Sequence, residues 1–267
     1  METRAFVRRT LLSVLCAAAA VAIALPAPAT AQEAPPPPAI LSPRPSALVK
    51  SKFVITGRVA ASVTGLSVGG ASASTVTVLA ADSEGATFTV EVAVTYGRHV
   101  IALSATSDGA TWSQPATIAV WNLGAVKRDV RLVLVDKSDF MLYVIRWNAV
   151  VAAYPIAIGM RGTPTPTGTR YLARPSASPS SVWGPFRMRL YRKAWVRVAY
   201  RVRVSGRLRT RYRKVLKLVG TPYYIHGTND RDSIGTPASH GCVRLWNKNL
   251  RVFRGLTYKC QLTILRP

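Results

Sequence analysis

The sequence predicts a mainly β protein, with an N-terminal Ig-like β-sandwich followed by a β-rich C-terminal domain that contains little helix. Short runs in which apolar and polar residues alternate with a period of two recur along the 267-residue chain. β-branched residues dominate these runs, and turns rich in Gly and Pro separate them. No long stripe of apolar residues with helical spacing is visible. These three observations favour strands over helices in both halves of the chain.

The N-terminus has the features of a secretory signal peptide, which we assign to residues 1–31. Arg4, Arg8 and Arg9 precede a short apolar run at 10–25, and Ala29-Thr30-Ala31 offers a small-x-small cleavage site. The run is too short to span a bilayer comfortably, so we expect cleavage and no integral membrane span afterwards. A Sec signal is favoured over the twin-arginine route. We therefore expect an exported protein of the cell wall, the periplasm or the extracellular space.

Residues 32–39 are a Pro-rich linker, which we expect to be stiff and extended. The segment 40–123 that follows contains the alternating runs of the expected sandwich. They lie at residues 53–59, 75–79, 87–94, 99–105 and 117–121. The segment resembles bacterial Ig-like modules only in this pattern, because it lacks the Cys…Trp…Cys signature. We expect a spacer or binding module without chemistry of its own.

Residues 127–267 are predicted to form the second domain. Strands are expected at residues 129–135, 140–147, 150–158 and 258–265, with one short helix near 248–253. The stretch 159–168 is too rich in Gly and Pro for regular structure. The alternating, arginine-rich run that begins at 196 is expected to turn at Ser205-Gly206 and return as a hairpin.

The charge is unevenly divided along the chain, whose formal net charge is +25. Residues 32–126 are balanced, whereas residues from 127 onward hold 28 Lys and Arg against five Asp and no Glu. Thirteen of these cations lie between positions 187 and 217, where no acid occurs. Because we expect export, the charge favours anionic cell-wall polymers over nucleic acid as partners. For the basic hairpin 187–217 we hypothesise electrostatic steering of acidic substrates, with a wall-contacting arm and a plain surface as alternatives.

The chemistry is concentrated in the window 223–247, "YYIHGTNDRDSIGTPASHGCVRLWN". It holds two of the three histidines, His226 and His240, and one of the three cysteines, Cys242. A thiol attacks as the thiolate, and a neighbouring imidazole can serve as its base and then as an acid. Gly241, directly before the thiol, permits a tight turn whose N–H groups can point at a developing oxyanion. These residue types favour a thiol nucleophile.

Three other interpretations of the same residues remain open at this point. Once Cys16 is cleaved off with the signal, Cys242 could pair with Cys260 in a disulfide. His226, His240 and Cys242 could bind zinc, although their spacing is poor and no fourth ligand is evident. Glycoside hydrolysis by two carboxylates is weaker still, because the region has no Glu and only Asp230 and Asp232 lie near the window.

The window as a whole resembles the catalytic motif of the L,D-transpeptidase family (YkuD-like). The matching residues are His226-Gly227-Thr228-Asn229, Ser233-Ile234-Gly235 and Ser239-His240-Gly241-Cys242-Val243-Arg244. Upstream, Thr165-Pro166-Thr167-Gly168 and Trp183-Gly184-Pro185-Phe186 are similar to the family's Thr-Pro-x-Gly turn and its approach to the site. The resemblance covers roughly the second half of the chain, from Arg128 to Pro267.

This resemblance implies a role for each matching residue. Cys242 is the implied nucleophile and His226 the implied base, oriented by a backbone carbonyl near Gly227. His240 and Gly241, with the Cys242 amide, are implied to form or support the oxyanion site. Residues implied to orient the motif or to bind substrate are Ser239, Arg244, Asn229 and Trp183. No metal or organic cofactor is implied.

The implied reaction is cysteine acyl transfer on the tetrapeptide stems of peptidoglycan, which would remodel the cell wall and influence cell shape. An amine acceptor would give a 3→3 cross-link or attach another group, and carbapenems are expected to acylate the cysteine. An L,D-carboxypeptidase that uses water, and a non-catalytic wall-binding protein, are the alternatives. The sequence specifies neither the acceptor nor the oligomeric state.

Overall fold

The computed structural model describes residues 33–82, 85–126, 131–178, 180–259 and 261–267. The expected signal peptide, Cys16 and Cys260 lie outside the described residues. Residues 34–267 group into one compact unit by their contacts. The described chain is mainly strand, which confirms the predicted fold class. No helix in this part of the chain is both long and apolar enough to cross a membrane.

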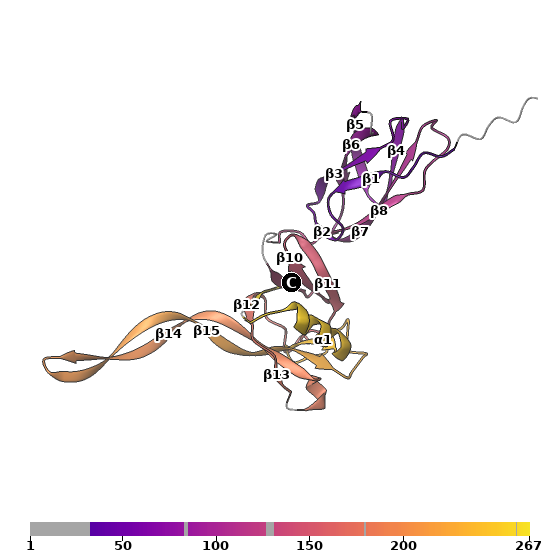
Figure 1. Cartoon of the computed structure of the whole chain (residues 1–267). Coiled ribbons are helices and arrows are strands. Elements are labelled where there is room, and N and C mark those ends of the chain that lie inside the picture. The colour runs from indigo at the N-terminus through magenta and orange to yellow at the C-terminus, as the bar shows by residue number, and fades with distance from the viewer. Residues whose placement is uncertain (1–32, 83–84, 127–130, 179, 260) are drawn as a thin grey trace, which may run out of the picture. The chain divides into compact units, whose positions relative to one another are not determined.

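The N-terminal β-region, residues 39–122, consists of short strands in two sheets (Figure 1). Its strands are β1 (Ala39–Ser42), β2 (Ala47–Leu48), β3 (Lys52–Val59), β4 (Gly65–Gly69), β5 (Ser72–Asp82), β6 (Gly85–Ala93), β7 (Gly97–Thr106) and β8 (Ala116–Asn122). One sheet has the order β1-β3-β6-β5, and β8-β7-β4 end the other. All five strands expected here are found, as β3, β5, β6, β7 and β8. β1, β2 and β4 were not predicted, and in β4 the glycines at both ends resemble turn residues.

Alternation of burial along these strands builds one shared core between the two sheets. Phe88 and Val90 of β6 are fully buried, as are Ile101 and Leu103 of β7 in the other sheet, and all four belong to one apolar cluster. Period-two alternation gives each strand one apolar face, and two such faces bury each other. The assignment of this region as an Ig-like module, and its proposed boundaries, remain predictions.

The C-terminal β-region, residues 132–266, holds the remaining strands and both helices of the described chain. Its strands are β9 (Leu132–Asp136), β10 (Met141–Arg146), β11 (Ala149–Pro155), β12 (Gly168–Leu172), β13 (Ser176–Ala177), β14 (Phe186–Val204), β15 (Arg207–Thr228), β16 (Val243–Trp246) and β17 (Gln261–Arg266). A 3₁₀ turn, η1 (Ser181–Trp183), precedes β14, and helix α1 (Asn247–Leu256) follows β16. The short helix expected near 248–253 is confirmed, as are the strands expected at 140–147, 150–158 and 258–265.

The strands of this region join the larger sheet in the order β16-β15-β14-β12-β17-β9-β10-β11-β2-β8-β7-β4, with β13 paired to β14. Most neighbours are antiparallel, but β16 runs parallel to β15, β17 runs parallel to β9, and β2 runs parallel to β8. The parallel β15–β16 pair needs a connection that returns the chain to the start of the strand. Residues 229–242 supply that connection and also carry the Ser-His-Gly-Cys motif.

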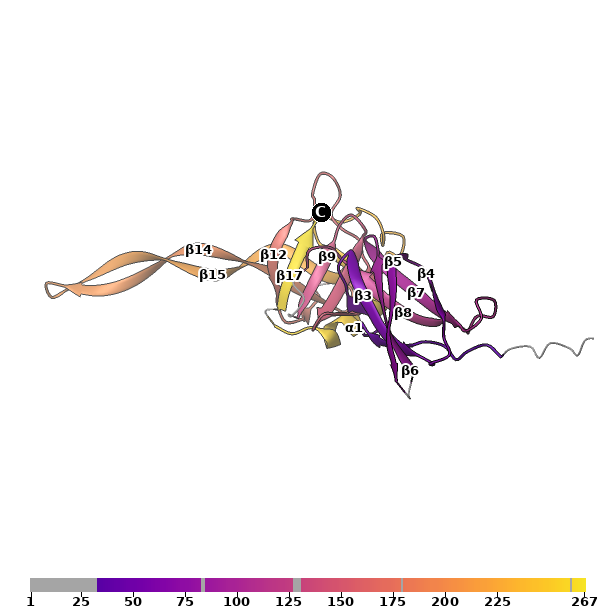
Figure 2. The same cartoon turned by 90° about the horizontal axis from the view of Figure 1, so that it is seen from above.

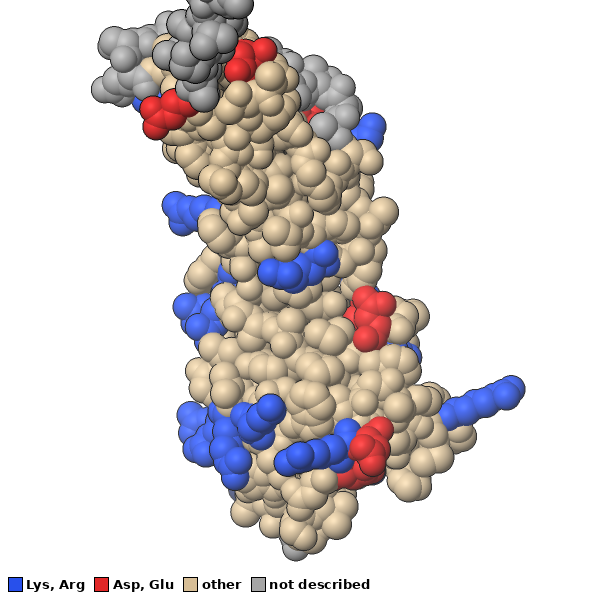
Figure 3. Space-filling model, turned by 90° about the vertical axis from the view of Figure 1, so that its right-hand side faces the viewer, with Lys and Arg blue, Asp and Glu red and all other residues tan. Residues whose placement is uncertain are grey.

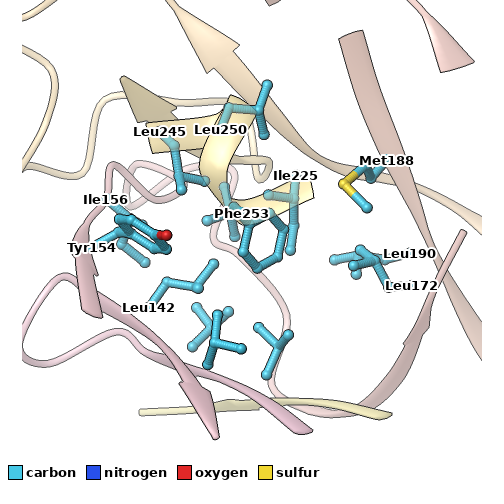
Figure 4. Close-up of a cluster of buried hydrophobic side chains, with 14 of the residues drawn as sticks. Leu142, Tyr154, Ile156, Leu172, Met188, Leu190, Ile225, Leu245, Leu250 and Phe253 are labelled. Atoms are coloured by element: carbon cyan, nitrogen blue, oxygen red, sulfur yellow. The ribbon is translucent and has the colours of Figure 1, made fainter. Parts of the chain in front are cut away.

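The core of the C-terminal β-region packs α1 against the sheet (Figure 4). Leu250 and Phe253 are three residues apart, so they lie on the same face of the helix, and both are fully buried. Phe253 meets Tyr154 edge-on, with ring centroids 6.3 Å apart. Ile225 of β15 and Leu142 of β10 complete this cluster. The core therefore fixes β15, the strand that carries His226, against the helix that follows β16.

The predicted arginine-rich hairpin is confirmed as the β14–β15 ribbon, which turns at Ser205 and Gly206. Both turn residues have positive φ, 48° and 75°, as a two-residue hairpin turn of the favoured hand requires. In both cartoon views the ribbon leaves the other strands of its region (Figures 1 and 2). The face drawn in Figure 3 carries charge much more sparsely than the ribbon does. On that face Lys and Arg stand singly or in small groups on a mostly uncharged surface.

Candidate active site

Three neighbouring strands, β14, β15 and β16, place the candidate site on one part of the sheet. His226 of β15 lies opposite Arg187 of β14 and opposite Arg244 of β16. Ile225 pairs with Val243, so Cys242 immediately precedes the strand that lies beside His226. Sixteen residues separate His226 from Cys242 in sequence, and the parallel pairing closes that gap. The structure thus brings together the two residues that the sequence singled out for catalysis.

His226 is buried, with 4% of its surface exposed. Its Nδ1 lies 2.7 Å from the carbonyl oxygen of Gly227. Because a carbonyl only accepts, Nδ1 carries the proton of the neutral ring and Nε2 is left as the basic nitrogen. This is the carbonyl contact near Gly227 that the family resemblance implied.

Burial, together with the positive charges of Arg244 and Arg187, lowers the pKa of His226 from 6.5 to about 4. The Gly227 carbonyl acts in the opposite direction, because it favours the protonated ring. The Trp183 ring lies 4.5 Å from the imidazole, centroid to centroid, and contributes to the burial. His226 is therefore neutral near pH 7 and available as a base.

Cys242 is a free thiol and is partly buried. Burial raises its pKa, whereas a hydrogen bond with the Tyr224 backbone and the charges of Arg244 and Arg187 act to lower it. The same two arginines thus act on both His226 and Cys242. Near pH 7 the pair is a thiol and a neutral imidazole, so activation of the sulfur requires proton transfer to a base.

The motif before Cys242 is held by hydrogen bonds within itself. The Ser239 hydroxyl donates to the Cys242 carbonyl oxygen at 2.6 Å and accepts from the Gly241 N–H at 3.1 Å. Ser239 is 1% exposed, whereas His240 is exposed. Ser239 therefore orients the turn from inside, and His240 is open to solvent.

Gly241 occupies a position that only glycine fits. Its φ is +105°, a conformation that L side chains rarely adopt. A Cβ at this position would also lie 2.6 Å from the Tyr223 ring. The turn that presents Cys242 thus depends on the absence of a side chain at 241.

The loop at 159–167 supports this turn from the other side. The Thr165 hydroxyl donates to the Gly241 carbonyl oxygen at 3.0 Å and accepts from the Gly159 N–H at 2.8 Å. Backbone hydrogen bonds join Met160 N–H to the Ser239 carbonyl and Ser239 N–H to the Ile158 carbonyl, both at 2.8 Å. The Thr-Pro-x-Gly stretch therefore positions the turn before Cys242, although none of its residues was predicted to be a site residue.

Trp183 and Asn229 are joined to the surroundings of His226 by ring contacts and hydrogen bonds. The Trp183 ring contacts the Tyr224 ring edge-on and also contacts the His226 ring. The Arg187 guanidinium lies over the rings of Trp183 and Tyr224. The Asn229 amide nitrogen lies 3.4 Å from the Ser181 carbonyl oxygen, so it links the end of β15 to η1. Asn247, the first residue of α1, in turn donates to Asn229. These contacts hold Trp183 over the imidazole.

A pocket of about 600 Å³ opens next to this group. Its lining residues are Thr228, Asn229, Arg231, Trp246, Asn247 and Lys248. Thr228 pairs with Trp246, two residues further along the strands than the pair of His226 and Arg244. Because side chains alternate between the two faces of a sheet, all four side chains lie on the same face. Arg244 lies 4.0 Å from Asp230, and 19% of its side chain is exposed. The pocket is thus a polar, cationic extension of the face that carries His226.

The sequence left open a disulfide, a zinc site and a pair of catalytic carboxylates. Cys242 is a free thiol, which does not support the disulfide, and Cys260 is outside the described residues. Among the described residues, no three His, Cys, Asp or Glu side chains are grouped so that they could hold a metal ion. Asp230 and Asp232 are exposed in the loop after β15.

Sequence reasoning missed several residues that shape the site. Arg187 and Tyr224 reach it through strand pairing, and Asn247 reaches it through the start of α1. Arg187 was counted only as part of the basic run. Tyr224 and Asn247 lay inside the window 223–247 and Thr165 lay inside a recognised motif, but none of the three had a role assigned.

Comparison with known proteins agrees with this geometry. Residues 130–258 match the YkuD family model, which describes the L,D-transpeptidase catalytic domain. The match includes His226, Cys242 and the loop that holds Thr165.

YkuD of Bacillus subtilis, which is named as an L,D-transpeptidase, is 32% identical over 103 residues. That alignment covers 39% of this chain and 46% of the relative. The chain thus spans about half the length of the curated relatives it matches.

Two solved structures illustrate the structural likeness. An L,D-transpeptidase from Mycobacterium smegmatis aligns at 17% identity over 86% of this chain and 100% of that one, with a TM-score of 0.35. The catalytic domain of an E. faecium L,D-transpeptidase aligns at 16% identity over 53% of this chain and 100% of that one, with a TM-score of 0.34. At these values neither structure transfers a role to any residue.

Proposed function

We propose that this protein is a peptidoglycan L,D-transpeptidase that works through a cysteine acyl-enzyme. The observation that carries the proposal is the juxtaposition of a group on β15 with a group that immediately precedes the adjacent parallel strand β16. One is a buried, neutral His226 whose Nδ1 is engaged by Gly227, and the other is the free thiol Cys242. The match of residues 130–258 to the L,D-transpeptidase catalytic domain supports the same chemistry.

In the first step, Nε2 of His226 takes the thiol proton of Cys242 while the sulfur attacks a peptide carbonyl carbon. The bond attacked joins the L-centre of a diamino acid to the terminal D-alanine of a tetrapeptide stem. The tetrahedral intermediate collapses to a thioester, and the imidazolium returns its proton to the departing D-alanine amine. The Arg187 and Arg244 charges make the imidazolium less stable, so this proton is readily given up.

The developing oxyanion requires donors beside the sulfur. The Cys242 N–H is the main candidate, and the exposed ring of His240 is the second. The Gly241 N–H already donates to Ser239, so its role is to hold the turn. Arg244 and the polar pocket beyond Thr228 are suited to a substrate carboxylate.

In the second step, an acceptor amine attacks the thioester carbonyl and His226 removes its extra proton. The carbon–sulfur bond then breaks, and the departing Cys242 thiolate takes that proton back from the imidazolium. An amine from a neighbouring stem gives a 3→3 cross-link, and a different amine attaches another group. Water as the acceptor gives L,D-carboxypeptidase activity through the same two residues. We propose that the protein is exported to the cell wall, where the N-terminal β-region serves as a spacer or wall-binding module.

A mass measurement tests the acyl-enzyme. Incubation with a carbapenem is expected to add the mass of the drug to the wild-type protein and to leave Cys242→Ala unchanged. His226→Ala should be acylated at least tenfold more slowly, because the thiol loses its base. An unmodified wild-type mass, together with tight binding to purified sacculi, would instead favour the non-catalytic wall-binding protein.

Product analysis then separates the acceptors. Purified disaccharide tetrapeptides are expected to yield 3→3 dimers with wild-type protein, and none with Cys242→Ala. Tripeptides without dimers would identify the carboxypeptidase. Cleavage elsewhere in the stem would contradict both.

A further inference from the structure

Beyond Tyr191, the outer part of the β14–β15 ribbon pairs with nothing but itself among the described strands. We call residues 191–204 and 207–220 the outer ribbon. Its two strands pair from Tyr191 and Gly220 out to Val204 and Arg207. The last pairing of β14 with β12 is at Tyr191, and β15 meets β16 only from Ile225 onward. At about 3.3 Å per residue, the outer ribbon extends the sheet by roughly 45 Å (Figures 1 and 2).

Burial stops where the outer ribbon begins. Met188 and Leu190 are each 1% exposed, but no residue of the outer ribbon is buried. Its large apolar side chains are open to solvent, with Trp195 at 69%, Leu208 at 59% and Tyr212 at 54% exposed. A two-stranded ribbon without a covering layer is only marginally stable in water. This ribbon therefore exposes apolar surface that an apolar phase or a partner molecule could cover.

The strand register sorts the side chains into rows. On one face, Val198, Tyr200, Val202 and Val204 of β14 lie opposite Arg213, Arg211, Arg209 and Arg207 of β15. On the other face, Lys193 and Arg203 of β14 lie opposite Leu218 and Leu208 of β15, and Trp195 lies opposite Leu216. Each face thus carries apolar and cationic side chains next to one another, and neither face is purely polar.

The cations of the outer ribbon have no acidic neighbour along the chain, because the sequence contains no Asp or Glu between Asp139 and Asp230. Some of them lie over aromatic rings instead. The Arg197 guanidinium is 4.0 Å from the Tyr212 ring centroid, and that of Arg213 is 5.7 Å from the Tyr200 ring. Eleven Lys and Arg side chains therefore present their charge to whatever meets the ribbon.

We propose that the outer ribbon is a membrane-binding arm that docks on the surface of an anionic phospholipid bilayer. Lipid phosphates would meet the arginines, and Trp195, Tyr212 and the leucines would enter the interfacial layer beneath them. A hydrophilic polyanion could pair with the charges, but it would leave the apolar rows exposed. The observed mixture of both kinds of side chain favours a surface that offers both charge and an apolar phase.

Ribbon geometry fits such a surface. Two-stranded ribbons twist strongly, so a flat surface meets one face and then the other along their length. Since both faces carry the same mixture, the twist does not interrupt the contact. Long arginine side chains can also bend their charged ends toward the phosphates while their stems cover apolar surface. This proposal does not rest on the proposed transferase activity, because it involves none of the site residues.

Vesicle sedimentation with the full chain tests the arm. Wild-type protein is expected to bind phosphatidylcholine vesicles that contain about 30% phosphatidylglycerol at least tenfold more strongly than pure phosphatidylcholine vesicles. A charge variant replaces Arg201, Arg203, Arg209 and Arg211 with Gln and should lose most of this binding. A matched control, with Gln at the exposed positions Arg161, Arg174, Arg251 and Lys259, should retain it.

An apolar variant distinguishes the membrane from a polyanion. Trp195→Thr, Leu208→Thr and Leu216→Thr together keep every charge, and these exposed positions favour Thr in a strand. Binding to anionic vesicles should fall at least fivefold, whereas binding to soluble poly-L-glutamate should stay unchanged. Circular dichroism and carbapenem acylation of the variants confirm that the rest of the chain is intact.

Two results would overturn the proposal. One is a wild-type protein that does not distinguish anionic from neutral vesicles. The other is binding to anionic vesicles that the apolar variant leaves unchanged and that poly-L-glutamate matches at equal charge concentration. The second result would identify the ribbon as an arm for anionic wall polymers, held by charge alone.

Discussion

The Thr165 hydroxyl donates a hydrogen bond of 3.0 Å to the carbonyl oxygen of Gly241, 76 residues further along the chain. The same hydroxyl accepts from the Gly159 N–H, and Thr165 is 2% exposed. One buried side chain therefore satisfies two backbone groups and ties the 159–167 loop to the turn that presents Cys242. The position of Cys242 is thus linked to a residue on a separate loop.

Thr165→Val should weaken both the fold and the site. Valine has nearly the same shape, but it leaves the Gly159 N–H and the Gly241 carbonyl without their partner, which costs about 1–3 kcal/mol. The turn before Cys242 should loosen, so carbapenem acylation should slow by about tenfold. Urea unfolding and acylation rates measure the two effects.

Thr167→Val, at an exposed position of the same loop, is the matched control and should change neither quantity. Equal acylation rates for Thr165→Val and wild type would show that the hydroxyl does not position the thiol.

Gly241→Ala should be more damaging than an ordinary glycine substitution. A residue other than glycine at φ +105° costs about 1–3 kcal/mol, and the added methyl group would also meet the Tyr223 ring. The turn must therefore shift, and Cys242 shifts with it. We expect acylation to be lost, as measured by mass spectrometry over hours.

Gly235→Ala separates the two causes. Gly235 also has positive φ, +88°, but no atom lies within 4 Å of the position its Cβ would take. This variant should lose stability only and keep its acylation rate. Equal losses of acylation in both variants would refute the steric explanation.

Much of the fold followed from local patterns in the sequence. Alternation predicted β3, β7 and β10, and Ser205-Gly206 predicted the turn of the ribbon, because these features depend only on neighbouring residues. Strand pairing does not depend only on neighbouring residues. The parallel register that sets His226 beside Arg244 is fixed by the burial of Ile225 and Val243 in a shared core, which no local pattern shows.

The candidate site could be predicted only in part, because some of its residues come together through strand pairing that local patterns do not show. His226 and Cys242 stood out because His and Cys are rare in this chain and lie in a recognisable motif. Arg187 stood among twelve other cations of the basic run, and nothing local set it apart. Its place opposite His226 comes from the β14–β15 register, which is determined by the whole ribbon.

The neutral state of His226 should make stability depend on pH. The folded protein keeps the ring unprotonated down to a pKa of about 4, whereas the unfolded chain binds the proton near 6.5. Between these values the unfolded state binds more protons, so the free energy of unfolding rises with pH. The contribution is fully present above pH 6.5, falls as the pH drops, and is lost below about 4. It amounts to roughly 3 kcal/mol.

Urea unfolding at intervals between about pH 4 and pH 7 measures this dependence. His226→Asn should flatten the curve by that amount. His99→Asn, which changes a half-buried histidine of β7 outside the site, should leave it as in the wild type. A His226→Asn curve parallel to that of the wild type would show that another group causes the slope.

Arg244→Gln should make the Cys242 thiol harder to ionise. The positive charge of Arg244 acts to lower a thiol pKa that burial has raised, so its removal should raise that pKa further. The pH at which iodoacetamide alkylation of Cys242 reaches half its maximal rate should therefore move upward. Arg251→Gln, an exposed change on α1, should not move it. A midpoint that stays in place or moves downward in Arg244→Gln would mean that Arg244 does not stabilise the thiolate. The role of Arg244 would then be limited to the proposed binding of a substrate carboxylate on the face of the sheet that leads to the pocket.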